Sequence, residues 1–141
     1  MTVNIQPLGM ILGPLLTALG KTMRSKLKEE GINYSMEHLY ILRIVRECKE
    51  SVVQQDLAEF LGKDKSYILR IVDILERDEL IRRIVDVNDR RRNILEVTYK
   101  GNQLLNRFYE HEMKLSELAY KDISDADIDT FFSVVAKMKL M

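Results

Sequence analysis

The sequence predicts a mainly α-helical protein with a small β-hairpin wing that follows a helix-turn-helix. Apolar residues recur at three- and four-residue steps over most of the chain, and two β-branched runs, at 81–85 and 94–98, flank an arginine-rich turn. The chain has 141 residues, 46% of them apolar, which suffices for one compact core. We therefore expect one folding unit, a winged helix-turn-helix flanked by N- and C-terminal dimerisation helices.

Two helices are expected before the helix-turn-helix. Apolar residues from Leu8 to Met23 share one face of a helix predicted over residues 8–30, which ends near Gly31. Pro14 lies inside this run and, because proline lacks a backbone N–H and clashes with the preceding turn, it predicts either a kink there or a helix that begins only near it. Ser35 is expected to cap a second helix that reaches about Cys48.

The central segment has the pattern of two helices joined by a tight turn. The first covers 54–61, and Asp64 is expected to cap the longer second one. Ala58 and Gly62 supply the small residue at the helix crossing and the residue that tolerates the turn. At about 100° per residue, one side of the second helix is apolar, and its other side carries polar residues that should point away from the core: Ser66, Arg70, Asp73 and Arg77.

The first and last helices carry apolar faces for which a second copy of the chain is the expected partner. Thr98 and Ser124 are predicted to cap two C-terminal helices. Because an exposed apolar face is costly, we expect these faces to form the core of a homodimer. The predicted dimerisation residues are Leu8, Ile11, Leu12, Leu15, Phe131, Phe132, Val135 and Met138. A ligand pocket is the alternative role for the apolar residues of the last helix.

Charge is balanced overall, with 22 basic and 22 acidic residues, although a nucleic-acid-binding domain is usually basic. The distribution is uneven, since residues 81–92 hold five arginines and two acids, whereas residues 110–129 hold seven acids and two lysines. The candidates for contact with double-stranded DNA are therefore the outward face of the second central helix and the hairpin tip: Lys65, Ser66, Tyr67, Arg70, Arg77, Arg90, Arg91 and Arg92.

The role of these side chains is left open by the sequence. An arginine can bind a guanine edge or a phosphate, and Tyr67 can contact a thymine methyl group or a phosphate. Tyr67 and Leu69 can equally pack against the wing or a neighbouring helix. An arginine run can also be no more than a solvated turn, although three adjacent arginines at a hairpin tip favour phosphate contact.

Several other functions are disfavoured. No apolar run approaches the roughly 20 residues of a membrane span, and the start MTVNIQPLG lacks the pattern of a secretion signal, so we expect a cytoplasmic protein without membrane contact. Cys48 is a lone cysteine, and the two histidines have no metal-ligand spacing. We find no phosphate-binding glycine loop and no nucleophile with a positioned base, and expect neither an enzyme nor a cofactor or metal.

The segment QQDLAEFLGKDKSYILRIVDILERDELIRR, followed by NDRRRNILEVTYKG, resembles the MarR (multiple antibiotic resistance regulator) family of bacterial transcription regulators. The resemblance implies a triangular homodimer with intertwined terminal helices that binds palindromic DNA and is often released by small phenolic or other lipophilic effectors. It also implies that Asp89, in the wing, orients the wing arginine and belongs to the DNA-binding set. Glu79 departs from the family pattern, which usually has glycine there, so the turn at that point is expected to differ.

We therefore expect residues 32–100 to form the DNA-binding region and residues 1–31, together with 101–141, the dimerisation region. The interpretation is a sequence-specific transcription regulator, with repression as the family's commoner habit, whose recognition helices are about 34 Å apart. The rival interpretation is a winged helix that binds an acidic protein partner instead of DNA.

Overall fold

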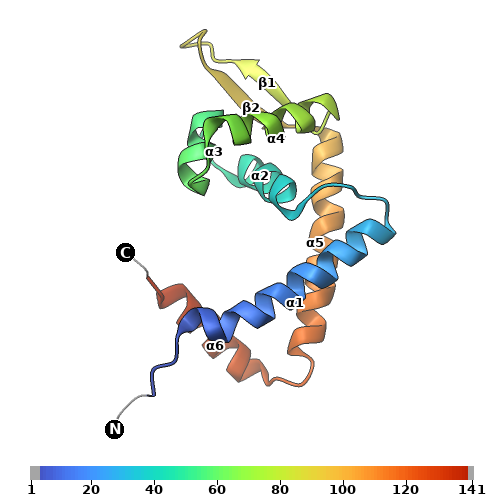
Figure 1. The fold of residues 1–141 in the computed structure, drawn as a ribbon, viewed down its shortest axis with the longest axis vertical. Helices are drawn as coiled ribbons and strands as arrows, with labels where there is room; N and C mark the ends of the chain where they lie inside the picture. The colour runs from blue at the N-terminus through green and yellow to red at the C-terminus, as the bar shows by residue number, and fades with distance from the viewer. Residues whose placement is uncertain (1–3, 140–141) are drawn as a thin grey trace.

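The computed structural model describes residues 4–139, so the ends of the expected dimerisation region, at 1–3 and 140–141, lie outside the described residues. The chain forms helices and one antiparallel hairpin in the predicted order (Figure 1). The elements are α1 (Leu8–Glu29), α2 (Met36–Glu47), α3 (Gln54–Leu61), α4 (Lys65–Arg77), β1 (Ile81–Val85), β2 (Asn93–Val97), α5 (Tyr99–Tyr120) and α6 (Asp125–Lys137).

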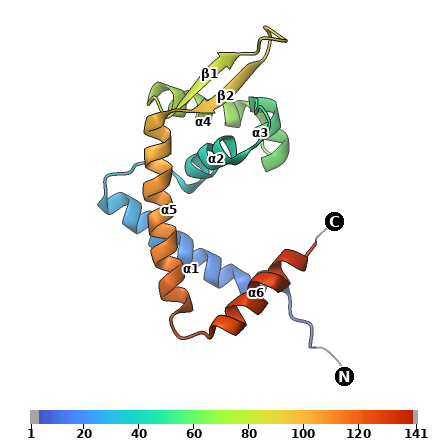
Figure 2. The ribbon, with the colours of Figure 1, turned by 180° about the vertical axis from the view of Figure 1, so that it is seen from behind.

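The molecule has two ends joined by α5. Helices α2, α3 and α4 and the hairpin gather at one end, and α5 runs from the base of the hairpin to the other end, where α1 crosses it and α6 folds back (Figures 1 and 2). The predicted mainly α-helical fold with a winged helix-turn-helix is thus confirmed. No helix within residues 4–139 is long and apolar enough to cross a membrane.

The wing is a two-stranded sheet that is attached to the link before α3. Strands β1 and β2 pair antiparallel with Ile81 opposite Val97 and Val85 opposite Asn93. The predicted extended link at 51–53 joins this sheet through one bridge, in which the Leu95 amide donates to the Val52 carbonyl at 2.8 Å. The side chains of Val52 and Leu95 are both buried, so the base of the wing is part of the core.

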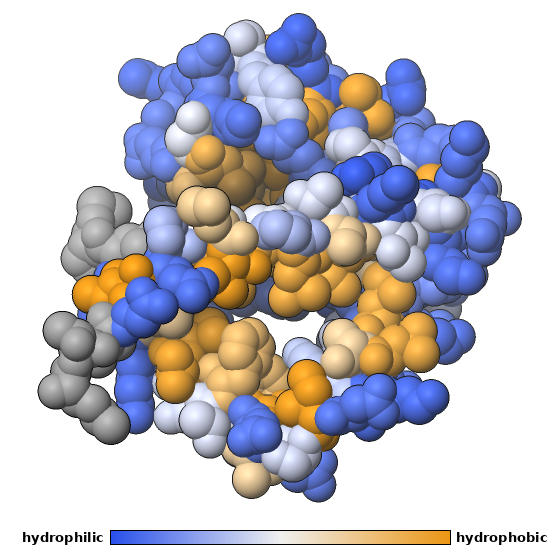
Figure 3. All heavy atoms as spheres, turned by 60° about the horizontal axis from the view of Figure 1, so that its bottom comes forward, coloured by the Kyte–Doolittle hydropathy of each residue, from blue (hydrophilic) through white to orange (hydrophobic). Residues whose placement is uncertain are grey.

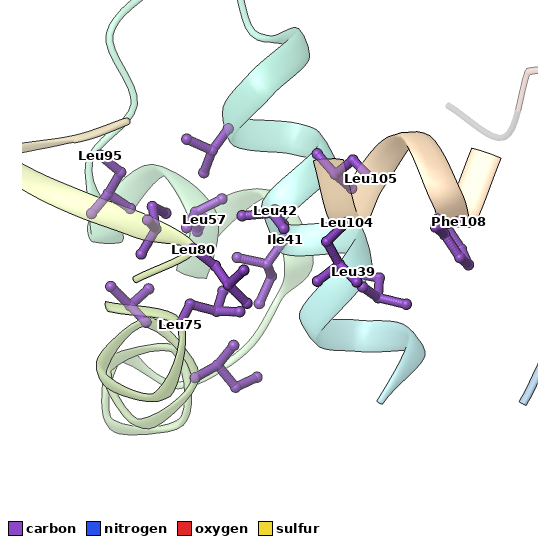
Figure 4. Close-up of a cluster of buried hydrophobic side chains, with 14 of the residues drawn as sticks. Leu39, Ile41, Leu42, Leu57, Leu75, Leu80, Leu95, Leu104, Leu105 and Phe108 are labelled. Carbon is purple, nitrogen blue, oxygen red and sulfur yellow. The ribbon is translucent and has the colours of Figure 1, made fainter. Parts of the chain in front are cut away.

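The core lies between the helix-turn-helix, the wing and the first half of α5. Fully buried side chains meet there from α2 (Leu42), α3 (Leu57), α4 (Leu75), the turn before β1 (Leu80) and α5 (Leu105) (Figure 4). Helix α1 contributes only Met23 and Leu27, both from its C-terminal half. The packed interior therefore belongs to the winged helix-turn-helix and fixes the position of α4 and of the hairpin.

The predicted N-cap residues are found at the starts of their helices, but one of them makes no capping hydrogen bond, and α1 starts before Pro14. The side chains of Ser35, Thr98 and Ser124 each accept a hydrogen bond from a backbone amide of the first turn, as predicted. Asp64 occupies the N-cap position of α4, but its side chain makes no capping hydrogen bond. Helix α1 begins at Leu8 with Pro14 inside it, so the alternative start near Pro14 is wrong. Because the N-terminal half of α1 is exposed, water can satisfy the carbonyl group that loses its partner there.

Three helices end in a left-handed residue. Gly31, Gly62 and Glu79 have φ values of 73°, 61° and 60°, and the residue after each donates its amide to a carbonyl five positions back. This is the Schellman arrangement, which usually requires glycine because a Cβ atom is unfavourable at positive φ. Glu79 therefore adopts the conformation that glycine would adopt, and the departure in sequence is not accompanied by a different turn.

The two terminal helices leave most of their apolar surface uncovered. In α6 no residue is buried, and Phe131, Phe132 and Val135 are each about half exposed at 45%, 50% and 45%. Leu8, Ile11 and Leu15 are also exposed in the N-terminal half of α1, whereas Leu12 is half-buried. Apolar residues gather across the face formed by this end of the molecule (Figure 3).

Candidate nucleic-acid interface

Helix α4 packs one face into the core and exposes the other. Ile68, Ile71, Val72 and Leu75 are buried, since they recur at helical spacing against α3 and the base of the wing. The predicted outward face is confirmed, because Ser66, Arg70, Asp73 and Arg77 are all exposed, and Lys65 is exposed as well. The first half of α4 thus presents two cations and a hydroxyl group on one rigid element.

Tyr67 lies at the edge of this face and is half-buried. Its hydroxyl group donates a hydrogen bond to the Glu37 carboxylate of α2, which raises the pKa of Tyr67. Its ring is flanked by two cations, with the Lys63 ammonium at 5.6 Å and the Arg70 guanidinium at 5.9 Å from the ring centroid. In this conformation Tyr67 packs against a neighbouring helix, and Lys63, which is not among the residues predicted from the sequence, lies beside the candidate surface.

The tip of the wing is built around Asp86 and Asp89. The Asp86 amide donates to the Arg92 carbonyl at 2.9 Å, and the Arg92 amide donates to the Asp89 carbonyl at 3.0 Å. The Asp89 carboxylate accepts from the Arg91 amide at 3.0 Å. The Asp89 carboxylate thus contacts the backbone of Arg91, and no ion pair between the two side chains is found within residues 4–139.

The arginines of the hairpin divide into two groups. Arg82 pairs with Glu96 across the sheet at 2.7 Å, and Arg83 reaches back to α4, where it pairs with Glu76 at 2.6 Å and Asp73 at 2.7 Å. Arg90, Arg91 and Arg92 at the tip are exposed and take part in none of the ion pairs of the described residues. Among the arginines of the hairpin, therefore, only those at the tip offer an unneutralised charge to a partner.

Arg83 is a positioning residue that the charge count could not distinguish from the tip arginines. Its side chain is 18% exposed and also donates to the Gln54 side chain at 3.2 Å, so one guanidinium joins β1 to both α3 and α4. The sequence gives one signal for this role, which is the alternation of side chains along a strand. Because neighbouring residues point to opposite faces, Arg83 faces α4 whereas Arg82, whose side chain is 63% exposed, faces away from it. These contacts set the orientation of the wing relative to α4.

Arg77 and Asp78 form the far end of the candidate surface. The Arg77 guanidinium pairs with the Asp78 carboxylate at 3.0 Å, and Tyr34 donates its hydroxyl to the same carboxylate at 2.8 Å. These two hydrogen bonds lower the pKa of Asp78, whereas burial and then Asp78 raise the pKa of Tyr34 to about 12. Arg77 is about three turns from Lys65 and is held by this junction, unlike the cations of the first half of α4.

The two predicted poles lie at opposite ends of the molecule. The outer face of α4 and the tip arginines lie at the wing end, whereas the acidic segment 110–129 covers the end of α5 and the start of α6 (Figures 1 and 2). The arginines of the wing tip are thus far from the acidic segment 110–129, although the net charge of the whole chain is zero.

Comparison with known proteins agrees with this architecture. The model of the MarR family matches residues 34–92, from the start of the second helix to the tip of the wing. The transcriptional repressor MprA of Escherichia coli K12 is 30% identical to this chain over 134 residues, which cover 88% of this chain and 74% of that protein.

Solved structures match over nearly the whole chain. A crystal structure of MarR superposes with a TM-score of 0.79 at 27% identity and covers 97% of this chain and 91% of that one. A MarR family regulator from Listeria monocytogenes in complex with a 26mer DNA superposes with a TM-score of 0.75 at 23% identity, covering 94% of this chain and 87% of that one. Sequence and structure together show that this protein belongs to the MarR family of transcription regulators.

Proposed function

We propose that this protein is a sequence-specific regulator of transcription that binds double-stranded DNA as a homodimer. The observation that carries the proposal is that the exposed cations of the first half of α4 and those of the wing tip lie at the same end of the molecule. Both elements are attached to the same packed core. The Listeria relative was solved with DNA, and MprA is named a repressor, which supports DNA binding and repression for this chain as well.

In this proposal α4 enters the major groove and the wing follows the backbone. Lys65, Ser66 and Arg70 are on the exposed face of the N-terminal half, the part of a recognition helix that reaches base edges. Arg90, Arg91 and Arg92 then contact phosphates or enter a narrow minor groove, where the negative potential attracts guanidinium groups. Tyr67 contributes to this surface through the contact of its ring with the Arg70 guanidinium.

The homodimer would form through the apolar faces of α1 and α6. Residues 1–31 and 101–141 would then make the dimerisation region, and residues 32–100 the DNA-binding region. In such a dimer the two copies of α4 would need to lie about 34 Å apart, one turn of duplex, for each to read one half of a palindromic operator. The exposure of Phe131, Phe132 and Val135 in the single chain supports this arrangement.

The test is to select binding fragments from genomic DNA with the purified protein and then to measure affinity for the selected site. Changing Arg90, Arg91 and Arg92 together to alanine should weaken binding by at least about 100-fold. It should also lower the slope of the salt dependence by about one unit for each phosphate that is no longer bound. Fluorescence anisotropy of a labelled duplex at several salt concentrations gives both quantities.

A matched control changes Lys114 and Lys121, which lie near the acidic end of α5, to alanine. This variant should bind the selected duplex like the wild type, because the charges that it removes are far from α4 and the wing. Failure to enrich any sequence, or equal losses of affinity in the control and the tip variant, would refute the proposal and favour the protein-binding role of the wing.

A cavity between the terminal helices and the DNA-binding region supports regulation by a small lipophilic or phenolic effector. It has a volume of about 370 Å³, lies between α1, α2 and α5, and has a mainly apolar lining that includes Leu19, Met23, Met36 and Leu115. A ligand here contacts both regions and so can favour one spacing of the two α4 helices over another. A phenol should release the labelled duplex from wild-type protein and fail to do so from Ser116→Phe, which fills the cavity.

A further inference from the structure

The hydroxyl group of Tyr67 connects the candidate recognition helix to a carboxylate on a different helix. Tyr67 is in the first turn of α4, and its hydroxyl donates to the carboxylate of Glu37, which is in the first turn of α2. Both residues are half-buried. Because a hydrogen bond to a charged acceptor is stronger than one between neutral groups, this contact restricts where the phenol ring lies.

The ring of Tyr67 in turn contacts two exposed cations at the start of α4. The Lys63 ammonium is 5.6 Å and the Arg70 guanidinium 5.9 Å from the ring centroid, which is within the range of a cation–π attraction. Arg70 follows Tyr67 at a spacing of i, i+3, so the two side chains are neighbours on the surface of α4. The amide of Lys63 donates to the Ala58 carbonyl at 3.0 Å, so the turn before α4 fixes its backbone. A change in the position of the ring therefore changes the surroundings of both cations.

Glu37 influences these cations without neutralising them. Within residues 4–139, Glu37, Lys63 and Arg70 take part in no ion pair. Arg83 shows the other way to hold an arginine, since carboxylates of α4 pair with its guanidinium directly. An arginine held in that way has its charge compensated, whereas Arg70 rests against a neutral ring and keeps its charge and its N–H groups for a partner.

We propose that Glu37 is a positioning residue for DNA recognition and that it acts on Arg70 through Tyr67. The Glu37 carboxylate holds the phenol, and the ring limits the Arg70 guanidinium to a smaller set of conformations on the exposed face of α4. This role rests on the proposed DNA-binding function, in which Arg70 reaches the DNA. An arginine that is already ordered loses less conformational entropy on binding, which contributes about two- to tenfold in affinity for one such side chain.

The effect should fall on discrimination between DNA sequences. A bidentate contact with a guanine edge needs one orientation of the Arg70 guanidinium, whereas attraction to phosphates depends mainly on charge. Loss of the contact with Glu37 should therefore lower the ratio of the affinities for the selected duplex and for an unrelated one. The slope of the salt dependence should stay the same, because no cation is removed. A merely structural role would lower both affinities by the same factor, through a smaller folded fraction.

Two variants at position 37 separate the hydrogen bond from the charge. Glu37→Gln keeps an oxygen that accepts from the Tyr67 hydroxyl, whereas the thioether of Glu37→Met is a weak acceptor. Both variants remove the same charge from the first turn of α2. Fluorescence anisotropy with the selected duplex and an unrelated duplex of equal length gives the ratio of affinities. The ratio should be about two- to tenfold lower in Glu37→Met than in Glu37→Gln, and Tyr67→Phe should lower it similarly relative to the wild type.

A double-mutant cycle shows whether the effect passes through Arg70. In an Arg70→Ala protein, Glu37→Gln and Glu37→Met should give the same ratio, because the side chain that they position is gone. The matched control is Glu59, an exposed carboxylate of α3 that accepts a hydrogen bond from the Gln55 side chain at 2.8 Å. Glu59→Gln and Glu59→Met should give equal ratios, since that hydrogen bond remains within α3.

Nuclear magnetic resonance follows the same contact without DNA. The Nε–H resonance of Arg70, assigned by its loss in Arg70→Ala, is displaced by the ring current of Tyr67, and Tyr67→Leu defines its value without the ring. The resonance should stay displaced in Glu37→Gln and move towards that of Tyr67→Leu in Glu37→Met and Tyr67→Phe. The hydrogen bond to Glu37 raises the pKa of Tyr67, so this pKa should fall in Glu37→Met.

Three results would overturn the proposed role of Glu37. These are equal ratios of affinity in Glu37→Gln and Glu37→Met, a difference between them that persists in Arg70→Ala, and an Arg70 resonance that is the same in Glu37→Met as in the wild type. A wild-type protein that selects no DNA would instead refute the proposed DNA-binding function, and this role with it. The two failures are therefore distinguishable, because the three results above leave DNA binding by the wild type intact.

Discussion

Helices α4 and α6 have the same length, 13 residues, but differ completely in how the chain covers them. Four residues of α4 are buried, with Ile68, Val72 and Leu75 at zero exposure, whereas no residue of α6 is buried although its phenylalanines and valines are apolar. The apolar stripe on α4 is covered within its own chain, whereas the stripe on α6 is mostly uncovered by the described residues, although Phe132 packs edge-on against Tyr120. An uncovered stripe of this kind is typical of an interface with another molecule.

The largest effect is expected where α6 is deprived of its proposed partner. Phe131→Asp together with Phe132→Asp should weaken the homodimer by more than about 1000-fold, because each interface contains two copies of both changes and buried aromatic anchors commonly contribute about 2 kcal/mol or more. Sedimentation velocity measures the loss of the dimer. Ser133→Asp, an exposed neighbour, is the control, and a wild-type protein that sediments as a monomer would contradict the proposed role of α6.

The corresponding change in α4 should act on folding and not on assembly. Leu75→Ala removes a fully buried side chain and should lower the free energy of unfolding by about 2–5 kcal/mol. Urea denaturation followed by circular dichroism gives this value. Leu69→Ala, at a position that is 44% exposed on the same helix, should cost much less, and equal losses at the two positions would show that α4 is not packed as described.

A smaller effect is expected from the contact that holds the wing to α4. Arg83→Met leaves Glu76 and Asp73 without their partner and should destabilise the fold by about 1–2 kcal/mol, since hydrogen bonds to charged groups contribute amounts of this order. Urea denaturation measures this change, and anisotropy should show weaker DNA binding because the tip arginines are displaced. Arg82→Met is the control, because Arg82 is 63% exposed and its pair with Glu96 should contribute little.

The smallest effect is a gain. Glu79→Gly should raise the free energy of unfolding by about 0.5–1 kcal/mol, because glycine adopts a positive φ without the penalty of a Cβ atom but loses more conformational entropy on folding. Thermal denaturation detects this as a higher midpoint. Gly62→Ala provides the inverse change at the same kind of turn and should lower the midpoint, while a loss of stability in Glu79→Gly would mean that the glutamate side chain stabilises the turn.

Much of the fold could be predicted because short-range rules place the elements. Periodicity located all six helices, and the hydroxyl caps at Ser35, Thr98 and Ser124 depend only on residues within the next turn. Asp64 failed as a cap although it occupies the right position, since a side chain at a helix start need not adopt the rotamer that caps it. Glu79 shows that a left-handed turn with the Schellman hydrogen bond can form at a residue other than glycine, so the residue type at this position did not predict the turn.

The sequence by itself determined the order of the elements, the outward face of α4 and the existence of a basic and an acidic pole, because these follow from spacing along one chain. Only the tertiary structure decided which charges are neutralised. It showed that Arg83 pairs with α4, that Tyr67 binds Glu37, and that Arg107 pairs with Glu30, far away in the sequence. Such pairings depend on distances between elements that are far apart in the sequence, and periodicity does not encode these distances. The energy of an ion pair depends on the distance between its two charges and on their burial.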